Sequence, residues 1–344
     1  MNGIYVHIPF CERKCNYCAF SSFTNLEEKD RYFKALIREI KDFDEGKLPK
    51  NEIFEKDDLH KIDTIYIGGG TPSLFDSGNI EKILDAIKEK FDLQKDNEIT
   101  IECNPNSLDE DKIKGYRALG INRLSIGVQS LQDSQLSFIG RLHNAEQALN
   151  AIEMSHKHFD NISCDFLIGL PRQEPEEFIF DLKKVVDIGV KHISAYMLQV
   201  EDKTPLADMA RKSPFILPDD DQSVEIYQKS ASFLQKQGLL QYEISNFAIK
   251  GYESKHNLKY WRGDNYIGFG LSAHSYVNGV RLANANNFKN YYSHKLALKE
   301  VLDKRQLIEE RLMLGLRCNL GVDLKYLEKL GYFIENNENY TNFL

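Results

Sequence analysis

Residues 5–20 read YVHIPFCERKCNYCAF, and this stretch decides the fold. The apolar run 4–8 that leads into it is typical of a strand, and Pro9 ends the run because proline offers no N–H to a neighbouring strand. Three of the chain's six cysteines follow, with the spacing C-x3-C-x2-C: Cys11, Cys15 and Cys18. We therefore predict that they lie on a loop after the C-terminal end of a strand, where α/β proteins usually carry their functional residues.

Three thiolates on one loop suit a soft metal centre. A tetrahedral zinc site usually takes four ligands, often as two separated pairs, whereas a [4Fe–4S] cluster is normally held by four thiolates. Three cysteines would leave one iron of such a cluster free to bind another group. A zinc site and a set of buried or disulfide-bonded cysteines are the alternatives. Disulfides are disfavoured because three is an odd number and nothing else in the sequence indicates secretion.

With an aromatic residue, Tyr17, before the last cysteine, the motif resembles the cluster motif of radical S-adenosylmethionine (SAM) proteins. The resemblance implies that the three cysteines bind three irons of a [4Fe–4S] cluster, and that the amino and carboxylate groups of SAM chelate the fourth. It also implies that electron transfer cleaves SAM to a 5′-deoxyadenosyl radical.

The length and composition indicate a globular protein with a barrel-sized domain and a smaller one: 344 residues, 42% hydrophobic and 28% charged. The net charge of −8 disfavours a general nucleic-acid-binding surface. The sequence shows no signal peptide and no run of about 18 apolar residues. We expect a protein of the reducing cytoplasm, reaching the inner membrane at most through a partner. Three isolated cysteines are interpreted as packing residues: Cys103, Cys164 and Cys318.

Short apolar runs alternate with longer segments whose apolar residues recur every three or four positions. The predicted strands are residues 4–8, 62–67, 99–103, 123–128, 162–168 and 192–198. The predicted helices between them are residues 26–43, 79–91, 109–119, 145–158 and 175–188. This alternation predicts an α/β fold with a parallel sheet and helices outside it. Six units are too few for an eight-stranded barrel, so we expect the partial, TIM-like (β/α)6 barrel that the radical SAM resemblance also implies.

The sequence after residue 198 predicts further helices and one strand. We expect a helix over 219–238 and a strand over 242–248, and then a helical pattern with segments at 296–302, 309–316 and 324–330. Residues 45–61 are charged, and we expect them to form a surface excursion. The Asn-rich residues 336–342 are expected to form a frayed C-terminal end. The expected domains are a radical SAM core barrel (1–240), a barrel-capping extension (241–285) and a short, mainly helical C-terminal domain (286–344).

Polar residues follow several predicted strands. The second is followed by the glycines of GGGTP, residues 68–72, where consecutive N–H groups can bind an anion, although a tight turn explains the same glycines. Glu102 and Gln129 stand at the ends of the third and fourth strands, and the fifth strand carries Asp165 among apolar neighbours. A carboxylate is costly to bury without a partner, so their shared position favours a polar ligand at the barrel mouth over structural hydrogen bonding alone.

Further motifs narrow the resemblance from the radical SAM family to one group within it. Tyr5, the cysteine motif, GGGTP, E-x-N-P, G-V-Q-S, G-R-x-H and D-x-L-I-G-L-P together resemble the oxygen-independent coproporphyrinogen III oxidase group, over residues 1 to about 280. Transferred by position, this implies a SAM site lined by Gly69, Gly70, Thr71, Glu102, Gln129, Arg141 and Asp165. Tyr5 and Tyr17 would flank SAM or the cluster, and Gln199 and His274 match ligand positions more loosely. Residues 311–317 resemble the start of the group's C-terminal helical domain.

Two departures from that group point to one branch of it. The true oxidases have a fourth cysteine, in C-x3-C-x2-C-x-C, where this chain has Phe20, and they extend well upstream of the motif. Both departures disfavour the decarboxylase, and the chain instead resembles the HemW-type branch of radical SAM haem chaperones.

Residues 256–261 read HNLKYW, and H-N-x-x-Y-W resembles a pattern associated with that branch and with haem. The resemblance implies haem contacts by His256, Asn257, Tyr260 and Trp261. A histidine can ligate haem iron and aromatic rings can flank a porphyrin. The alternative is a structural histidine beside a core tryptophan, and three other histidines are candidate ligands: His7, His143 and His274.

The sequence thus favours a radical SAM [4Fe–4S] haem chaperone that binds haem and delivers it to haemoproteins such as membrane respiratory enzymes. The alternatives are an oxygen-independent coproporphyrinogen III dehydrogenase (decarboxylase) of porphyrin biosynthesis and, from another class, a zinc-bound interaction module. The expected cofactors are the cluster, SAM and haem, and the expected partner is a haem-accepting protein, not a nucleic acid. SAM is expected to be bound or cleaved, and coproporphyrinogen oxidase activity to be absent.

Overall fold

A computed structural model describes residues 1–43, 49–52, 59–213 and 217–332. A single mixed sheet of 12 strands runs through it, in the order β12-β11-β10-β9-β1-β2-β3-β4-β5-β6-β8-β7. The strand that precedes the cysteines, β1 (Asn2–Ile8), lies inside this sheet and pairs in parallel with β2 (Lys61–Gly69) and β9 (Tyr266–Phe269). The stretch that opens the sequence is therefore held from both sides.

The six predicted strands are all present and parallel. Beyond β1 and β2 they are β3 (Asp92–Cys103), β4 (Arg123–Gln129), β5 (Asn161–Ile168) and β6 (His192–Met197). The strands at the two edges pair antiparallel: β7 (Leu240–Gln241), β8 (Asn246–Ala248), β10 (His274–Val277), β11 (Val280–Asn284) and β12 (Leu296–Val301). Because the strand order begins at β12 and ends at β7, the barrel is open.

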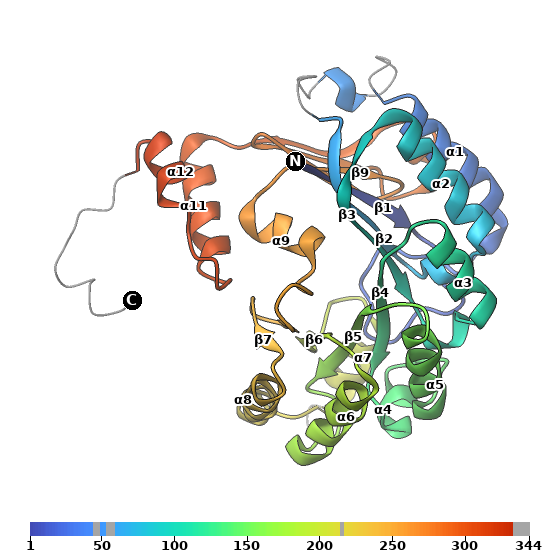
Figure 1. The fold of residues 1–344 in the computed structure, drawn as a ribbon, viewed down its shortest axis with the longest axis vertical. Helices are drawn as coiled ribbons and strands as arrows, with labels where there is room; N and C mark the ends of the chain where they lie inside the picture. Colours follow the sequence, from blue (N-terminus) through green and yellow to red (C-terminus); the bar gives the residue numbers. More distant parts are fainter. Residues whose placement is uncertain (44–48, 53–58, 214–216, 333–344) are drawn as a thin grey trace.

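Helices cover the outer side of the curled sheet (Figure 1). Those that join the parallel strands are α1 (Lys29–Lys41), α2 (Ser77–Lys90), α3 (Glu110–Ala118), α4 (Asp133–Phe138), α5 (Ala145–His156) and α6 (Pro175–Ile188). The later helices are α7 (Pro205–Lys212), α8 (Asp220–Lys236), α9 (Lys255–Arg262), α10 (Phe288–Tyr291), α11 (Lys304–Gly315) and α12 (Leu324–Lys329). Asp76, Asp109 and Asn144 cap α2, α3 and α5 by accepting backbone N–H groups, which fixes where these helices begin.

Alternation along the strands gives the sheet two different faces. Outward-facing residues such as Ile65, Leu124 and Ile126 are fully buried in one apolar core with the helices. The inward-facing side chains are polar and hydrogen-bond between strands, as in Tyr66, Glu102, Ser125, Ser163, Asp165 and His192. A TIM barrel usually fills its interior with layers of branched apolar residues, so this interior is built for polar contacts.

Three local expectations were wrong. Residues 296–301 form strand β12 and not a helix, because they extend the antiparallel edge beside β11. Residues 242–245 interrupt the strand predicted over 242–248, so only β8 remains of it. The segment predicted as a surface excursion contains Lys50, which is 3% exposed and paired with Glu39. Residues 44–48, 53–58 and 336–342 lie outside the described residues.

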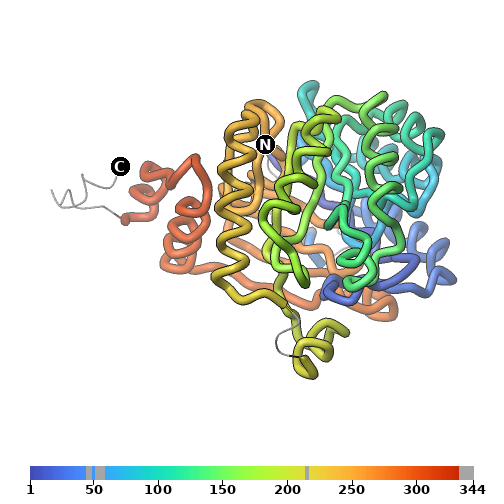
Figure 2. Tube along the Cα trace, turned by 90° about the horizontal axis from the view of Figure 1, so that it is seen from below, coloured from blue at the N-terminus to red at the C-terminus, as the bar shows by residue number. Residues whose placement is uncertain are grey.

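Of the C-terminal helices, α11 packs beside α9, away from the helices that cover the sheet's outer side (Figure 1). Arg311 of α11 donates a hydrogen bond to the Gly263 carbonyl that follows α9. In Figure 2, α11 and α12 lie to one side of the barrel, while α7 stands out from its body. Within the described residues, no helix is both long and apolar enough to cross a membrane.

Candidate functional site

The cysteine loop follows β1 as predicted and is fastened to its neighbours. Cys11 N donates to the Phe23 carbonyl at 3.0 Å, and Phe23 N donates to the Pro9 carbonyl at 2.7 Å, which closes the loop on itself. Two side chains from elsewhere donate to its sulfurs: the Thr71 hydroxyl to Cys11 Sγ at 3.5 Å, and Arg141 Nη1 to Cys15 Sγ at 3.6 Å. Hydrogen bonds of this kind, made by residues outside the loop, orient the side chains that ligate a metal centre.

The donor set of this loop fits an iron–sulfur cluster. Cys11, Cys15 and Cys18 are free thiols, and burial raises the pKa of Cys18, so iron must displace its proton. Among the described residues, no three His, Cys, Asp or Glu side chains are grouped so as to hold one metal ion. A [4Fe–4S] cluster does not require such a group, because each thiolate binds a different iron.

Arg141 joins the cysteine loop to the barrel. Its Nη2 donates to Asn104 Oδ1 and to the Gly127 carbonyl, both at 2.7 Å, and Asn104 Nδ2 donates to the Thr71 hydroxyl at 3.1 Å. Arg141 Nε is buried and has no partner among the described residues. A buried guanidinium donor without a partner is costly, so this position suits an anionic group such as a carboxylate.

Glu102 is the buried carboxylate of the third strand. Its two oxygens accept hydrogen bonds from the Tyr66 hydroxyl and from Gly69 N, both at 2.9 Å. Burial raises the pKa of Glu102 to about 6, despite the opposing effect of the two donors. The carboxyl is therefore mostly protonated only below about pH 6, unless a bound ligand supplies further donors.

Three backbone N–H groups of the GGGTP loop donate hydrogen bonds to other parts of the protein. Gly69 N binds Glu102, Gly70 N donates to the Ile8 carbonyl at 2.8 Å, and Thr71 N donates to the Phe10 carbonyl at 2.7 Å. Gly69 has φ +116°, and a Cβ there would lie 2.6 Å from the His7 ring. These three N–H groups fasten the loop to Glu102 of β3 and to residues 8 and 10, as a tight turn would, and the binding of SAM by this loop stays a prediction.

Two further polar residues of the parallel strands belong to the predicted SAM site, Asp165 within β5 and Gln129 at the end of β4. Asp165 accepts hydrogen bonds from the Ser125 hydroxyl at 3.0 Å and from the Ser163 hydroxyl at 3.2 Å, and burial raises its pKa. Gln129 ends β4 with φ +69°, a conformation that non-glycine residues rarely adopt. Backbone strain of this kind often marks a ligand site. The binding of SAM by these residues stays a prediction.

The two tyrosines of the cysteine stretch take different places. The Tyr5 hydroxyl is hydrogen-bonded to His7 Nδ1 at 2.9 Å, inside the barrel. Tyr17 packs against a small apolar cluster, Ile139, Leu167 and Leu170, and burial raises its pKa. Tyr17 thus supports the loop beside Arg141, whereas Tyr5 faces the interior near His7.

The HNLKYW stretch forms helix α9, whose residues hydrogen-bond to Met1, Thr64 and Glu98. His256 is fully buried, with Nδ1 hydrogen-bonded to the Thr64 hydroxyl at 2.8 Å and Nε2 to the Tyr260 hydroxyl at 2.9 Å. Its backbone N–H donates to Glu98 at 3.0 Å. Burial lowers the pKa of His256 to about 3, so the ring is neutral. Both ring nitrogens are engaged, and iron ligation by His256 would require one of these bonds to break.

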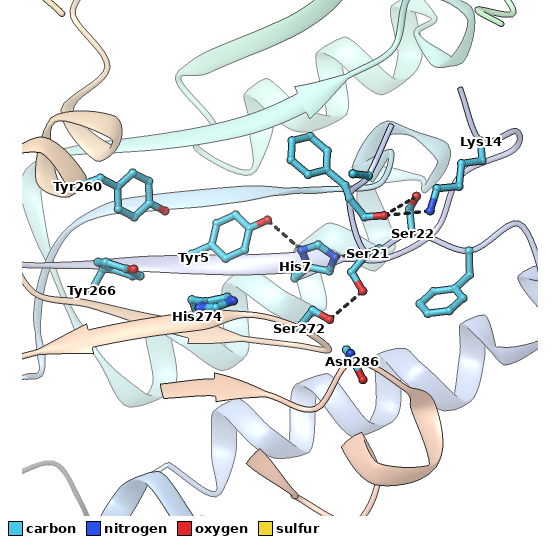
Figure 3. Close-up of a pocket in the computed structure, with 13 residues that line it drawn as sticks. Tyr5, His7, Lys14, Ser21, Ser22, Tyr260, Tyr266, Ser272, His274 and Asn286 are labelled. Atoms are coloured by element: carbon cyan, nitrogen blue, oxygen red, sulfur yellow. Dashed lines mark hydrogen bonds between the residues drawn. The ribbon is translucent and has the colours of Figure 1, made fainter. Parts of the chain in front are cut away.

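A cavity of about 710 Å³ runs along β1 from α9 to the cysteine loop (Figure 3). Tyr260 and Tyr266 lie at one end of it and Lys14 at the other. Its other lining residues are Tyr5, His7, Ala19, Phe20, Ser21, Ser22, Phe23, Ser272, His274 and Asn286. This volume falls within the range of roughly 300–1,000 Å³ typical of small-molecule sites.

Several predicted residues lie away from this cavity. Asn257 and Trp261 are half-buried on α9 and do not line it. Gln199 is exposed after β6, and His143 is buried with Nε2 hydrogen-bonded to the Val128 carbonyl at 3.0 Å. Tyr260 is therefore the predicted haem contact that lines the cavity.

Sequence reasoning missed three residues of the site: Tyr66, Asn104 and Tyr266. The two-residue period of a strand could have found Tyr66, because it places this side chain on the same face as Thr64. Tyr266 gave no local signal, since β9 joins the sheet beside β1 only in the folded chain.

Two family models match the chain. The model described as the radical SAM superfamily matches residues 5–185, and that of the HemN C-terminal domain matches residues 302–331. The second match contains residues 311–317 and so confirms the resemblance to the C-terminal domain, although the match begins earlier, at residue 302.

Curated relatives and a solved structure agree with these models. The chain is 35% identical to the heme chaperone HemW of Lactococcus lactis subsp. lactis, over 95% of this chain and 84% of the relative. It is 36% identical to the heme chaperone HemW of Bacillus subtilis, over 96% and 87% of the two chains. The structure of coproporphyrinogen III oxidase (HemN) from Escherichia coli matches with a TM-score of 0.79 and 25% identity, over 95% and 78%. The predicted radical SAM fold is thus confirmed.

Proposed function

Since the chain belongs to the radical SAM superfamily and, within its coproporphyrinogen III oxidase-like group, to the HemW-type branch, we propose that it is a haem chaperone. It binds haem in the cavity along β1 and delivers it to a haem-accepting protein such as a membrane respiratory enzyme. The observation that carries the proposal is this cavity, which joins the cysteine loop to Tyr260 of the HNLKYW helix. The proposed location is the cytoplasm, with access to the membrane through the acceptor.

Cys11, Cys15 and Cys18 would hold a [4Fe–4S] cluster, which in this family supplies the electron for SAM cleavage. The chain's own residues would prepare the place for SAM. Arg141, with one buried donor free, would pair with the SAM carboxylate, and Glu102 would accept hydrogen bonds from its N–H or O–H groups. Asp165, Gln129, Gly69, Gly70 and Thr71 would line the remainder.

The HNLKYW helix would act on haem mainly by shaping the cavity wall. His256 holds the Tyr260 hydroxyl, and the Tyr260 ring meets Tyr266 edge-on at a centroid distance of 4.7 Å. Aromatic rings of this kind can flank a porphyrin face. Asn257 and Trp261 would contribute only through the packing of the helix.

The alternative is a coproporphyrinogen III dehydrogenase, which the similarity to HemN favours. Against it, Phe20 stands where the true oxidases have their fourth cysteine, and its side chain is 70% exposed beside the cavity. An exposed apolar ring at the cavity rim suits contact with a hydrophobic macrocycle better than redox chemistry.

Haem delivery can be tested directly. The cluster-loaded chain would be saturated with haem and mixed with the apo-form of a membrane b-type haemoprotein in vesicles. We expect the acceptor's absorption spectrum to develop faster than with the same concentration of free haem. Transfer no faster than from free haem, or haem retained by the chain, would contradict a delivery function.

A further inference from the structure

We propose that His274 is the axial ligand of the haem iron in the cavity along β1. The inference rests on the proposed function, because it assumes that the cavity receives haem. It differs from the expectation that the histidine of the HNLKYW stretch binds the iron. The argument compares all nine histidines of the chain, each of which lies in the described residues.

Most histidines are removed from the cavity or already engaged. Three have both ring nitrogens hydrogen-bonded: His7, His192 and His256. Five do not line the cavity: His60, His143, His156, His158 and His294. Only His274 both lines the cavity and has no side-chain hydrogen bond to a described residue.

His274 is presented by a firmly held piece of backbone. It is the first residue of β10 and pairs with Ala283 of β11. Gly268 of β9 packs so closely on it that a Cβ at Gly268 would lie 2.0 Å from the His274 carbonyl oxygen. The Ser275 hydroxyl also accepts a hydrogen bond from Gly268 N at 2.9 Å. A ligand on a paired strand keeps its position better than one on a loop.

The His274 ring is ready to bind a metal. It lies between Tyr266 and Ser272 along the cavity wall, on the side facing Tyr5 and His7 (Figure 3). Its side chain is exposed to the cavity, and partial burial, together with Arg281, lowers its pKa. Neutral imidazole is the form that ligates iron.

The remaining walls match the chemistry of an iron porphyrin. Tyr5, Tyr260 and Tyr266 offer aromatic surface for the macrocycle, and Phe20 and Phe23 extend it toward the cysteine loop. Lys14, at that far end, can pair with a propionate carboxylate, because its amino group reaches the cavity and, within the described part of the chain, donates only to the Phe20 carbonyl at 3.2 Å. The ligand class is therefore a planar aromatic iron chelate with carboxylates at one edge.

The test is a ferric haem titration of the anaerobically reconstituted, cluster-loaded chain, followed by absorption, electron paramagnetic resonance and resonance Raman spectroscopy. The wild type is expected to show a histidine-ligated spectrum. His274→Ala should lose that signature and bind haem at least about tenfold more weakly, a loss typical of even supporting residues at metal sites. Added imidazole should restore the signature. His274→Met should bind haem with a different axial-ligand spectrum.

The control is His256→Gln, which should keep the histidine signature even where its affinity falls. A His274→Ala protein with the wild-type spectrum and affinity would overturn the inference and leave haem binding intact. Loss of the signature in His256→Gln, with retention in His274→Ala, would assign the iron to α9 instead. A wild type that binds no haem would overturn the proposed function together with the inference.

Discussion

The imidazole of His256 lies against the ring of Tyr66, with 5.3 Å between the ring centroids and 29° between the planes. Tyr66 in turn donates its hydroxyl to Glu102, which also accepts the N–H of Gly69. One tyrosine thus joins the HNLKYW helix to the carboxylate predicted to bind SAM. The HNLKYW helix and Glu102 therefore share a buried network, although they are about 150 residues apart in the chain.

Removal of the Tyr66 hydroxyl should weaken SAM binding. Tyr66→Phe keeps the ring against His256 but takes one of the two donors from Glu102. A hydrogen bond to a charged group contributes about 1.5–3 kcal/mol, so we expect SAM affinity, measured by calorimetry on the reconstituted protein, to fall about tenfold. Tyr116→Phe is the control, because Tyr116 donates to the Phe75 carbonyl on the other side of the sheet. An equal loss in both variants would exclude a specific role for Tyr66.

SAM binding should also depend on pH through Glu102. The pKa of this carboxyl is about 6, raised by burial, so the carboxylate form grows as the pH rises through 6. We expect SAM affinity to increase between pH 5.5 and 7, as the ionised acceptor becomes available. Glu102→Gln should bind SAM more weakly at pH 7 and show a flatter profile over the same range. A Gln variant with the full pH dependence would assign the titration to another group.

The cluster should depend on the cysteine loop alone. Cys15→Ala removes one of three thiolates and should abolish the cluster, seen as loss of about four irons per chain and of the visible absorption. Cys103→Ala is the matched control, since Cys103 is 3% exposed in the apolar core. We expect the control to retain its iron, with only a modest loss of stability. Full iron content in Cys15→Ala would refute the assignment.

His256 should make the fold sensitive to acid. Its pKa in the folded chain is about 3, below the ordinary value near 6.5, so unfolded chains take up a proton that the folded chain does not. Its stabilising effect is complete above pH 6.5 and is lost as the pH falls toward 3. Between pH 7 and pH 5 this removes about 2 kcal/mol. Urea unfolding at both pH values should show a smaller drop for His256→Gln, whereas His294→Gln, outside the barrel interior, should match the wild type.

The buried pair Lys50–Glu39 should be a strong determinant of stability. Lys50 Nζ lies 2.7 Å from Glu39 Oε1, and both side chains are less than 5% exposed. Lys50→Met leaves the Glu39 carboxylate buried without its cation, which should cost about 3–5 kcal/mol of unfolding free energy. Lys41→Met breaks the exposed pair with Glu89 and should cost less than about 1 kcal/mol. Similar losses in the two variants would contradict the burial of Lys50.

Much of this arrangement could be predicted from local sequence. Pro9 and the three cysteines place the loop after β1, and the strands carrying Glu102 and Asp165 were predicted because each is a short apolar run between helical segments. The interior itself was harder to predict, because its partners come together only in the sheet. Tyr266 reaches the cavity because β9 pairs with β1 at the other end of the chain, and His274 follows on β10, which pairs with β9.

The HNLKYW stretch shows the same limit. Its sequence pattern indicated a connection with haem, and its aromatic residue Tyr260 does line the cavity. The pattern could not indicate that His256 would be enclosed between Thr64 and Tyr260, since Thr64 lies 192 positions earlier in the chain. The helix predicted over residues 296–302 was wrong for a related reason. Residues 296–301 pair with the free edge of β11, and this pairing outweighed their helical pattern.

The most direct test of the central claim is a haem titration of the cluster-loaded chain, run in parallel with a coproporphyrinogen III turnover assay containing SAM and a reductant. We expect stoichiometric haem binding, with no conversion of propionates to vinyl groups. Turnover of coproporphyrinogen with weak or absent haem binding would contradict the chaperone and show that Phe20 is tolerated in an active oxidase.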